Sequence, residues 1–390
     1  MSNPSARLLI PVLSATNFAI GVGAFLVIGV LTPIATDLAM SEAEAGMIVT
    51  AYALAYAFGS PLLVSLTGSW PRRQLLSLAL LVFAAAAALM AMAPDAETLI
   101  AGRVLAALSA GIVSPVAASV AAASAPPERR GRALAGAFVG LTLAQVIGVP
   151  GGAWIGYTYG WRADFWAVAA LAVIVAGLVR VFVPASIQVE PGKLRALAET
   201  VRNGRAMLVL SFTPVFVAAA YVFYTFAAPV LEAGMGLGRD GVSLFLFVVG
   251  GGAVVGNLMT GRLVDRIGPV KTLTLQAVMT VLVLAVFSFL PIPFWALLVA
   301  GFLWSVFGWG FFAAQQIRLI ATAPERATLL LSLNAASLYL GMSVGSAIGS
   351  ALAGAAGLAW LGLAGAAVAV LALLDLLWSE RLLAKGAAAR

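Results

Sequence analysis

The sequence predicts an all-α membrane protein with twelve transmembrane helices, arranged as two pseudo-symmetric six-helix bundles. Three observations support this fold class. The 390 residues are 63% hydrophobic and only 9% charged, whereas soluble domains have about 25% charged residues. Twelve apolar stretches are long enough to cross a bilayer. Several short motifs recur at one spacing, close to half the chain length.

Each predicted span has the roughly 20 apolar residues that a helix needs to cross the hydrocarbon core. Short polar breaks such as "SEAEA" and "APPERRGR" separate the spans. The first run is too long for the hydrophobic region of a signal peptide, so we interpret it as a retained span. The spans are expected at residues 8–31, 46–67, 74–93, 98–122, 131–156, 164–183, 207–231, 242–262, 272–290, 294–320, 327–353 and 358–378.

The basic residues orient the chain in the membrane. If the twelve spans alternate, 19 of the 22 Lys and Arg residues fall on the side of the N-terminus. Only Arg162 and Arg239 fall on the other side, and Arg103 lies within the fourth span. Because cytoplasmic loops carry such an excess, both termini are expected in the cytoplasm. The basic residues lie between apolar runs, so no nucleic-acid partner is expected.

An internal repeat defines the expected domains. The sequence "PERR" at 127–130 matches "PERA" at 324–327, an offset of 197 residues. Three glycine pairs share this offset: Gly59 and Gly256, Gly148 and Gly345, and Gly152 and Gly349. We therefore expect bundles at 1–183 and 207–390. A basic cytoplasmic linker at 184–206 would join them, part of it as an amphipathic helix on the inner leaflet. Repeats of this kind are typical of secondary transporters.

Small residues recur at every fourth position of the fifth and eleventh spans. Such stripes let two helix backbones approach closely in a membrane. We therefore expect helix interfaces there, which could slide when one half rocks against the other, and a bend at Pro150. The stripes comprise Gly136, Gly140, Ala144, Gly148, Gly152 and Gly156, and then Ser337, Gly341, Gly345, Gly349 and Ala353.

The composition excludes several function classes. The chain has no Cys and no His, so disulfides, Cys or His metal sites and a histidine base are ruled out. No loop is long enough for a catalytic domain. We therefore expect neither an enzyme nor a cofactor or metal, but a monomer in the lipid bilayer that binds a small-molecule substrate. Two halves that move against each other at their interface argue against a channel. A sensor built on the same scaffold remains an alternative.

Several motifs, in order, resemble the major facilitator superfamily. The stretch "GRLVDRIGPVK" (261–271) is similar to that family's loop signature, and "GVPGG" (148–152) to the fifth-helix signature of its antiporters. The stretch "AGRVLAALSAG" (101–111) resembles the fourth-helix arginine motif. The stretches 31–63 and "GWRADFW" (160–166) are similar to bacterial drug and sugar-efflux members. The resemblance covers the whole chain. It implies a proton-driven exporter of small organic molecules in a bacterial inner membrane, working by alternating access.

The sequence departs from the family pattern at two places. In the first-half loop signature, "LTGSWPRRQLL", Gly68 and Ser69 stand where Asp265 and Arg266 stand in the second half. Only the second-half gate contact is therefore expected, with Asp265 facing the N-terminal end of the fifth helix. Many relatives also carry a proton-binding glutamate at the place of Ala24. Its absence keeps a proton-independent uniporter or an importer as alternatives.

The resemblance also selects candidate site residues, because the first, fourth, seventh and tenth helices line the cavity in this fold. Arg103 is expected to attract an anionic group or to tune a nearby acid. The carboxylates Asp37, Asp164, Glu232 and Asp375 lie near span ends and are interpreted as solvated charges; Asp37 or Glu232 would carry a coupled proton. The substrate-binding candidates are Asn17, Tyr52, Tyr56, Arg103, Tyr224, Trp304 and Gln315. The gating candidates are Gly148, Pro150, Gly152, Asp265, Arg266, Gly345 and Gly349.

Overall fold

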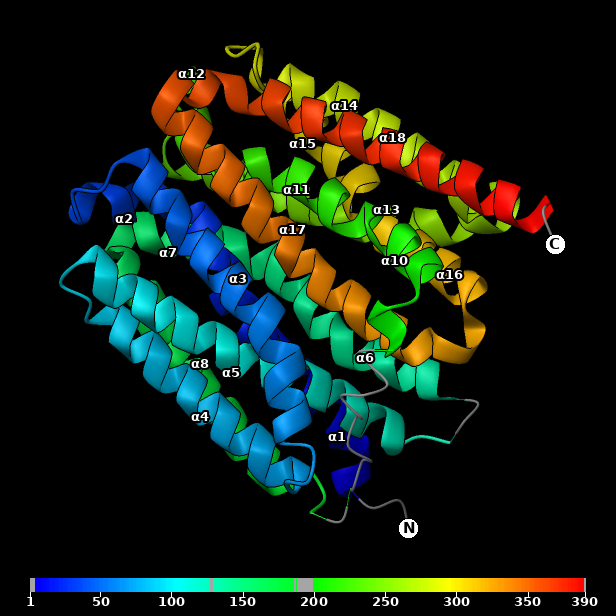
Figure 1. Cartoon of the computed structure of the whole chain (residues 1–390). Helices are drawn as coiled ribbons and strands as arrows, with labels where there is room; N and C mark the ends of the chain where they lie inside the picture. Colours follow the sequence, from blue (N-terminus) through cyan, green and yellow to red (C-terminus); the bar gives the residue numbers. More distant parts are fainter. Residues whose placement is uncertain (1–3, 127–128, 186, 188–198, 389–390) are drawn as a thin grey trace. The chain divides into compact units, whose positions relative to one another are not determined.

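The computed structural model describes residues 4–126, 129–185, 187 and 199–388, and nearly all of them are helical (Figure 1). Within these residues, twelve helices are long and apolar enough to cross a membrane. They follow the predicted spans in order, so the predicted fold class is confirmed. The spans are Leu8–Gly29, Glu42–Leu66, Arg72–Ala91, Ala96–Ala123, Arg130–Tyr159, Trp161–Phe182, Gly204–Tyr224, Arg239–Ile267, Pro269–Val286, Phe294–Thr322, Leu329–Ala356 and Leu358–Ala384.

The chain divides into two compact units. Unit 1 contains Met1–Met40 and Ala51–Lys193, and unit 2 contains Ser41–Thr50 and Leu194–Arg390. Most of the expected linker at 184–206, including any amphipathic helix there, lies outside the described residues. The proposed domain boundaries at 183 and 207 therefore stay a prediction.

The first six spans belong to unit 1, except that residues 42–50 of the second span fall in unit 2, and several of these spans are broken into shorter helices. The first span consists of α1 and a short 3₁₀ turn, and the fifth span is interrupted by a π-helical turn. The elements are α1 (Pro4–Phe25), the 3₁₀ turn η1 (Leu26–Gly29), α2 (Leu31–Asp37), α3 (Glu42–Leu66), α4 (Arg72–Ala91), α5 (Ala96–Ala123), α6 (Arg130–Leu143), the π turn η3 (Ala144–Gly148), α7 (Val149–Tyr159) and α8 (Trp161–Phe182).

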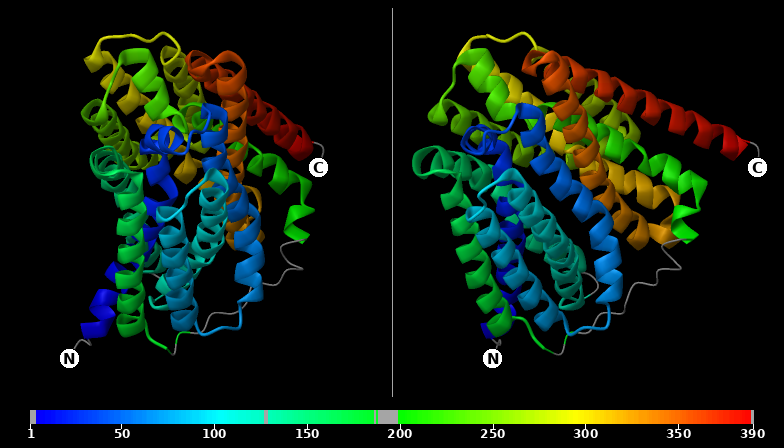
Figure 2. Two further views of the ribbon diagram at one scale, coloured as in Figure 1. Left: turned by 90° about the vertical axis from the view of Figure 1, so that its left-hand side faces the viewer. Right: turned by 60° about the vertical axis from the view of Figure 1, so that its left-hand side comes forward.

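Unit 2 repeats this plan. The last span, α18, runs without a break in both views of Figure 2. The elements are α10 (Gly204–Leu210), α11 (Phe212–Tyr224), α12 (Ala227–Met235), α13 (Arg239–Ile267), α14 (Pro269–Val286), α15 (Phe294–Trp309), α16 (Phe311–Thr322), the 3₁₀ turn η4 (Pro324–Arg326), α17 (Ala327–Ala356), the 3₁₀ turn η5 (Leu358–Trp360) and α18 (Leu361–Ala388).

Helix packing inside each unit reflects the sequence repeat. In unit 1, α1 packs on α6, and α4 packs on both α5 and α8. In unit 2, the equivalent helices pair in the same way: α11 packs on α17, and α14 packs on both α15 and α18 (Figure 1). The 197-residue offset is therefore the sequence signature of two copies of one bundle.

The first spans of the two units break at corresponding levels, whereas the breaks in the fifth and tenth spans have no counterpart, because α17 and α5 are continuous. In unit 1, α1 ends at Phe25 and the chain continues as η1. In unit 2, α11 ends at Tyr224 and α12 begins at Ala227, while Gly310 separates α15 from α16. In the fifth span, the π turn directly precedes Pro150. Because proline has no N–H, the regular hydrogen-bond ladder cannot continue there.

Candidate functional site

Arg103 is buried at the break of the first span. Its guanidinium is fully excluded from solvent, and it donates hydrogen bonds of 2.6 Å to the Gly23 carbonyl and 3.0 Å to the Ala24 carbonyl. These carbonyls belong to the last turn of α1, the negative end of the helix dipole, which favours a cation. Arg103 therefore caps the C-terminal end of α1.

The ring of Tyr52 completes this arrangement. The guanidinium carbon of Arg103 lies 4.1 Å from the ring centroid, so the π face stabilises the charge. Ala24 contributes only its backbone carbonyl to this contact. The structure brings the two candidates Arg103 and Tyr52 together, and Tyr56 lies buried one turn further along α3. The full burial of Arg103 fits a positioning role better than the attraction of an anionic substrate.

Asn17 joins three helices of unit 1. Its amide donates to the Leu13 carbonyl at 3.3 Å and to the Ala137 carbonyl at 3.0 Å, while its oxygen accepts from the Ser114 hydroxyl at 2.8 Å. Both amide hydrogens are thus used within α1, α5 and α6. We therefore assign Asn17 to helix packing rather than to the substrate contact that the sequence suggested.

We expect Asn17→Ala to lower the stability of the protein by about 1 to 3 kcal/mol, because the Ala137 carbonyl and the Ser114 hydroxyl lose their partner in a buried site. Thermal unfolding in detergent measures this effect. Ser119→Ala is the control, because its hydroxyl bonds only within α5, to Val116. Unchanged stability together with weaker substrate binding in Asn17→Ala would instead show that Asn17 contacts the substrate.

The small-residue stripe of the fifth span contacts α1 of the same unit. A side chain at Gly140 would overlap the Ser14 carbonyl, and one at Gly148 would meet Val22. In unit 2, the equivalent glycines of α17 face α11: side chains at Gly345 and Gly349 would meet the Ala218 and Val222 carbonyls. The predicted close helix approach is confirmed, but its partner at each of these four glycines is a helix of the same unit. The expectation that the stripes form the sliding contact between the two halves is therefore wrong at these positions. A gating role for these glycines and Pro150 stays a prediction.

In unit 2, four aromatic side chains surround the breaks of the seventh and tenth spans. They are Tyr221 and Tyr224 at the end of α11 and Trp304 and Trp309 at the end of α15. The ring centroid of Tyr224 lies 5.2 Å from that of Trp304 and 6.1 Å from that of Trp309. Tyr221 lies 5.7 Å from Tyr224 and 6.4 Å from Trp309. We call these four residues the aromatic cluster; the sequence candidates Tyr224 and Trp304 belong to it.

Two polar groups of the aromatic cluster have no hydrogen-bond partner among the described residues. They are the Tyr221 hydroxyl and the Trp304 indole N–H, and both are buried. Phe223 and Phe287 pack against the indole edge to face, at centroid distances of 5.8 Å and 6.3 Å. Because buried polar groups are normally paired, these two groups are suited to a ligand. Trp309 was not among the sequence candidates, because its approach to the two tyrosines of α11 is a tertiary contact.

Gln315 lies apart from the aromatic cluster, beside a charged group near the end of the tenth span. Its amide donates to the Val209 carbonyl at 2.7 Å, which also accepts from Arg318 at 3.4 Å. Arg318 is buried and bonds to Glu380 at 2.8 Å and to the Ser379 hydroxyl at 2.6 Å. These contacts tie the tenth span to α18.

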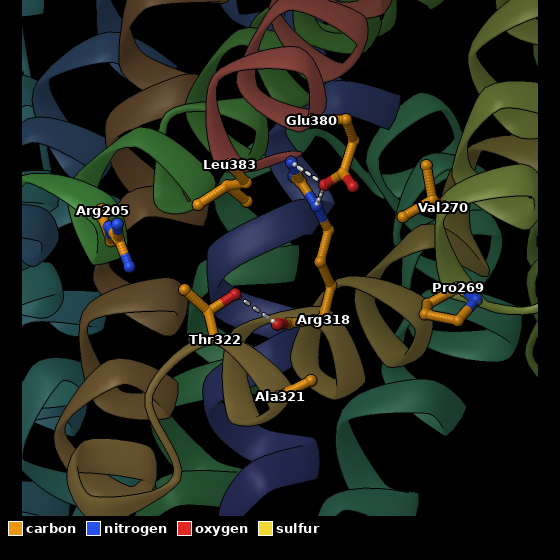
Figure 3. A pocket seen from close by; sticks show the side chains of 8 residues that line it. All are labelled: Arg205, Pro269, Val270, Arg318, Ala321, Thr322, Glu380 and Leu383. Atoms are coloured by element: carbon orange, nitrogen blue, oxygen red, sulfur yellow. Dashed lines mark hydrogen bonds and ion pairs between the residues drawn. The ribbon is translucent and has the colours of Figure 1, made fainter. Parts of the chain in front are cut away.

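A small cavity opens beside this ion pair. It has a volume of about 300 Å³, and Figure 3 shows Arg318 and Glu380 joined within it, with Arg205 apart from the pair. Glu380 neutralises Arg318 within the cavity, and Arg205 is a second cation in its lining. Its lining residues are Arg205, Pro269, Val270, Arg318, Ala321, Thr322, Glu380 and Leu383.

The two predicted coupling acids, Asp37 and Glu232, lie in different surroundings. Asp37 forms an ion pair with Arg162 and accepts a hydrogen bond of 3.2 Å from the Trp161 indole. The bond from Arg162 holds the pKa of Asp37 below its usual value, so Asp37 stays ionised at neutral pH and makes a poor proton carrier. Glu232 lies half-buried on α12.

One acid contradicts the prediction that it is a solvated rim charge. Asp164 is only 3% exposed, and its Oδ2 has no hydrogen-bond partner in the described part of the chain. The sequence places it at a span end, where water is expected, but α7 and the break of the first span cover it. Asp375 is half-buried and accepts from the Ser211 hydroxyl at 3.0 Å.

Asp265 and Arg266 lie exposed in the last turn of α13. Gly268, with a φ of 82°, ends this helix in a conformation that favours glycine. The predicted contact between Asp265 and the fifth span would join the two units, and it stays a prediction.

Comparisons with known proteins identify similar transporters. The profile of the Major Facilitator Superfamily matches residues 13–316 and again residues 225–386. The inner membrane transport protein YdhP of Escherichia coli K12 is 33% identical over 375 residues, covering 93% of this chain and 94% of that protein. A chloramphenicol resistance protein of Streptomyces lividans is 37% identical over 252 residues, 64% of each chain. A bacterial homologue of the human lysosomal transporter Spinster has a similar fold, with a TM-score of 0.78 at 17% identity, covering 98% of each chain.

Proposed function

Because the chain belongs to the major facilitator superfamily, we propose that it exports small amphipathic organic molecules by alternating access, in exchange for protons. Family membership makes the chain a multi-pass membrane transporter and not an enzyme. The substrate class would include drug-like compounds, sugars or related metabolites. The location would be a bacterial inner membrane, with both termini in the cytoplasm, as the distribution of Lys and Arg suggests.

The aromatic cluster is the observation that supports this substrate class best. Its four rings offer a flat apolar surface, and the Tyr221 hydroxyl and the Trp304 N–H offer one polar contact each. Ligand sites in transporters commonly form at interrupted helices near the membrane midplane, and the cluster surrounds two such breaks. None of its four side chains carries a formal charge, which suits neutral or weakly charged amphipathic molecules. The name of the Streptomyces relative, which refers to chloramphenicol resistance, agrees with export of such compounds.

We expect a strain that overproduces the protein to tolerate higher concentrations of at least one compound in a panel of antibiotics, dyes, sugars and nucleosides. The compound found in this way then serves in purified vesicles. With an imposed proton gradient, wild-type protein should accumulate the compound, and a protonophore should abolish accumulation. Protein-free vesicles are the control.

A proton-independent facilitator is the second candidate, and Ala24 favours it. The acid of many relatives is absent at this position, and the Ala24 carbonyl binds Arg103 instead. In this case the compound would equilibrate across the vesicle membrane at the same rate with and without the gradient. That result would exclude antiport and retain transport.

A further inference from the structure

We infer that Asp164 is a proton-binding site of unit 1, and that the break of the first span senses whether the proton is bound. Asp164 lies in the first turn of α8. It is almost fully buried, and its Oδ2 has no hydrogen-bond partner within the described residues. The role of Asp164 as the coupling site would rest on the proposed antiport. Proton binding at Asp164 does not rest on the antiport.

The carboxyl group occupies a recess formed by two glycines of α7. A side-chain carbon at Gly156 would lie 2.5 Å from Oδ2, and one at Gly152 would lie 3.7 Å from Oδ1. The absence of a side chain at Gly156 therefore makes room for the carboxyl group, whereas a carbon added at Gly152 would only touch it at an ordinary contact distance. This recess explains how an acid can be buried there without distortion of the helices.

The same glycines also contact the break of the first span. A side chain at Gly156 would meet Val30 as well as Asp164, and one at Gly152 would approach Leu26. Leu26 begins the 3₁₀ turn η1, which directly follows the turn of α1 that Arg103 holds. A change of charge at Asp164 thus acts beside the point where the first span changes helical form.

No described cation is positioned to pair with the carboxylate. The nearest arginine in the sequence, Arg162, binds Asp37 and the Ala93 carbonyl instead. The elements packed against α8 are α1, α4 and α7. Residues 8–25 of α1 contain no charged residue. The remaining titratable groups of α4, α7 and α8 lie in end turns: Arg72, Arg73, Tyr157, Tyr159 and Arg180.

Two opposing effects would make the proton exchangeable. A buried carboxylate without a partner is costly in a membrane protein, and this cost favours proton uptake. Asp164 lies in the first turn of α8, where the positive end of the helix dipole stabilises the ionised form and favours release.

An infrared titration of the purified full-length protein in lipid vesicles tests proton binding directly. The 15 Asp and Glu residues all contribute to such a titration, so the signal is the difference between wild type and Asp164→Asn. We expect wild type to show one C=O band of a protonated carboxyl that disappears as the pH is raised and that Asp164→Asn lacks. Asp375→Asn, which removes the partner of the Ser211 hydroxyl, should retain this band. Identical titrations of wild type and Asp164→Asn would overturn the proposal.

Two glycine variants keep the test informative if Asp164→Asn does not fold. Gly156→Ala places a methyl group against Oδ2 and should shift the midpoint of the titration. Gly151→Ala is the matched control on the same helix, because no atom lies within 4 Å of the added carbon. Equal midpoints in these two variants would contradict the recess as the proton site.

Hydrogen exchange of residues 23–30 tests whether the break senses the proton. Asparagine mimics the neutral acid, so wild type and Asp164→Asn should show equal amide protection at low pH. They should diverge above the midpoint of the titration, where wild type becomes ionised. Equal protection at every pH would overturn the sensing role. Vesicle transport is a separate readout. If transport by wild type is the same with and without the proton gradient while Asp164 titrates, the proposed antiport is wrong and the proton-binding site is retained.

Discussion

Arg103→Ala is expected to abolish transport and to destabilise unit 1. The change removes both hydrogen bonds to the end of α1 and leaves the Gly23 and Ala24 carbonyls buried without this partner. Each orphaned carbonyl costs about 1 to 3 kcal/mol, and the contact with the Tyr52 ring is lost as well. The loss of these hydrogen bonds indicates that stability falls together with transport. Transport in vesicles and thermal unfolding measure the two effects.

Two further variants separate the role of the charge from the geometry. Arg103→Lys keeps the positive charge but lacks the planar fork that binds two carbonyls at once, so we expect partial loss of both stability and transport. Arg239→Ala is the control, because the ion pair of Arg239 with Asp240 is solvent-exposed and such pairs contribute little. Full transport by a stable Arg103→Ala protein would remove Arg103 from the mechanism.

The fold could be predicted from sequence because the bilayer imposes strong rules. Spanning helices need about 20 apolar residues, and short breaks such as "PDAE" at residues 94–97 separate them clearly. The offset between Gly148 and Gly345 identified the repeat before any packing was known. The structure adds that each of these glycines faces the first helix of its own unit, which periodicity alone could not indicate.

The candidate site was harder to predict because burial depends on tertiary contacts. Asp164 and Asp37 both stand near span ends, yet one is covered by α7 and the other pairs with Arg162. Sequence position cannot distinguish these two environments. Asn17 was selected for its polarity within a span, and the structure shows that polarity used for helix packing. Tyr224 and Trp304 were predicted from helix number in the resembling family, and they do lie together.

Removal of the Trp304 ring is expected to have the second large effect. Trp304 contacts Tyr224, Phe223 and Phe287, so Trp304→Ala should lower stability by about 3 to 5 kcal/mol and abolish substrate binding. Because lost binding could then reflect lost structure, Trp304→Phe is the sharper variant. It keeps an aromatic ring and removes an N–H that bonds to nothing in the described structure. Stability should therefore change little.

Binding affinity distinguishes a ligand contact from packing in this variant. If the indole N–H donates to the substrate, Trp304→Phe loses one hydrogen bond, worth about 0.5 to 1.5 kcal/mol, and affinity falls about two- to tenfold. Tyr221→Phe should have an effect of the same size, because it removes the second unpartnered group. Trp295→Phe is the matched control, since Trp295 is 70% exposed. Unchanged affinity in both Trp304→Phe and Tyr221→Phe, with intact stability, would mean that the aromatic cluster is only packing and that the substrate binds elsewhere.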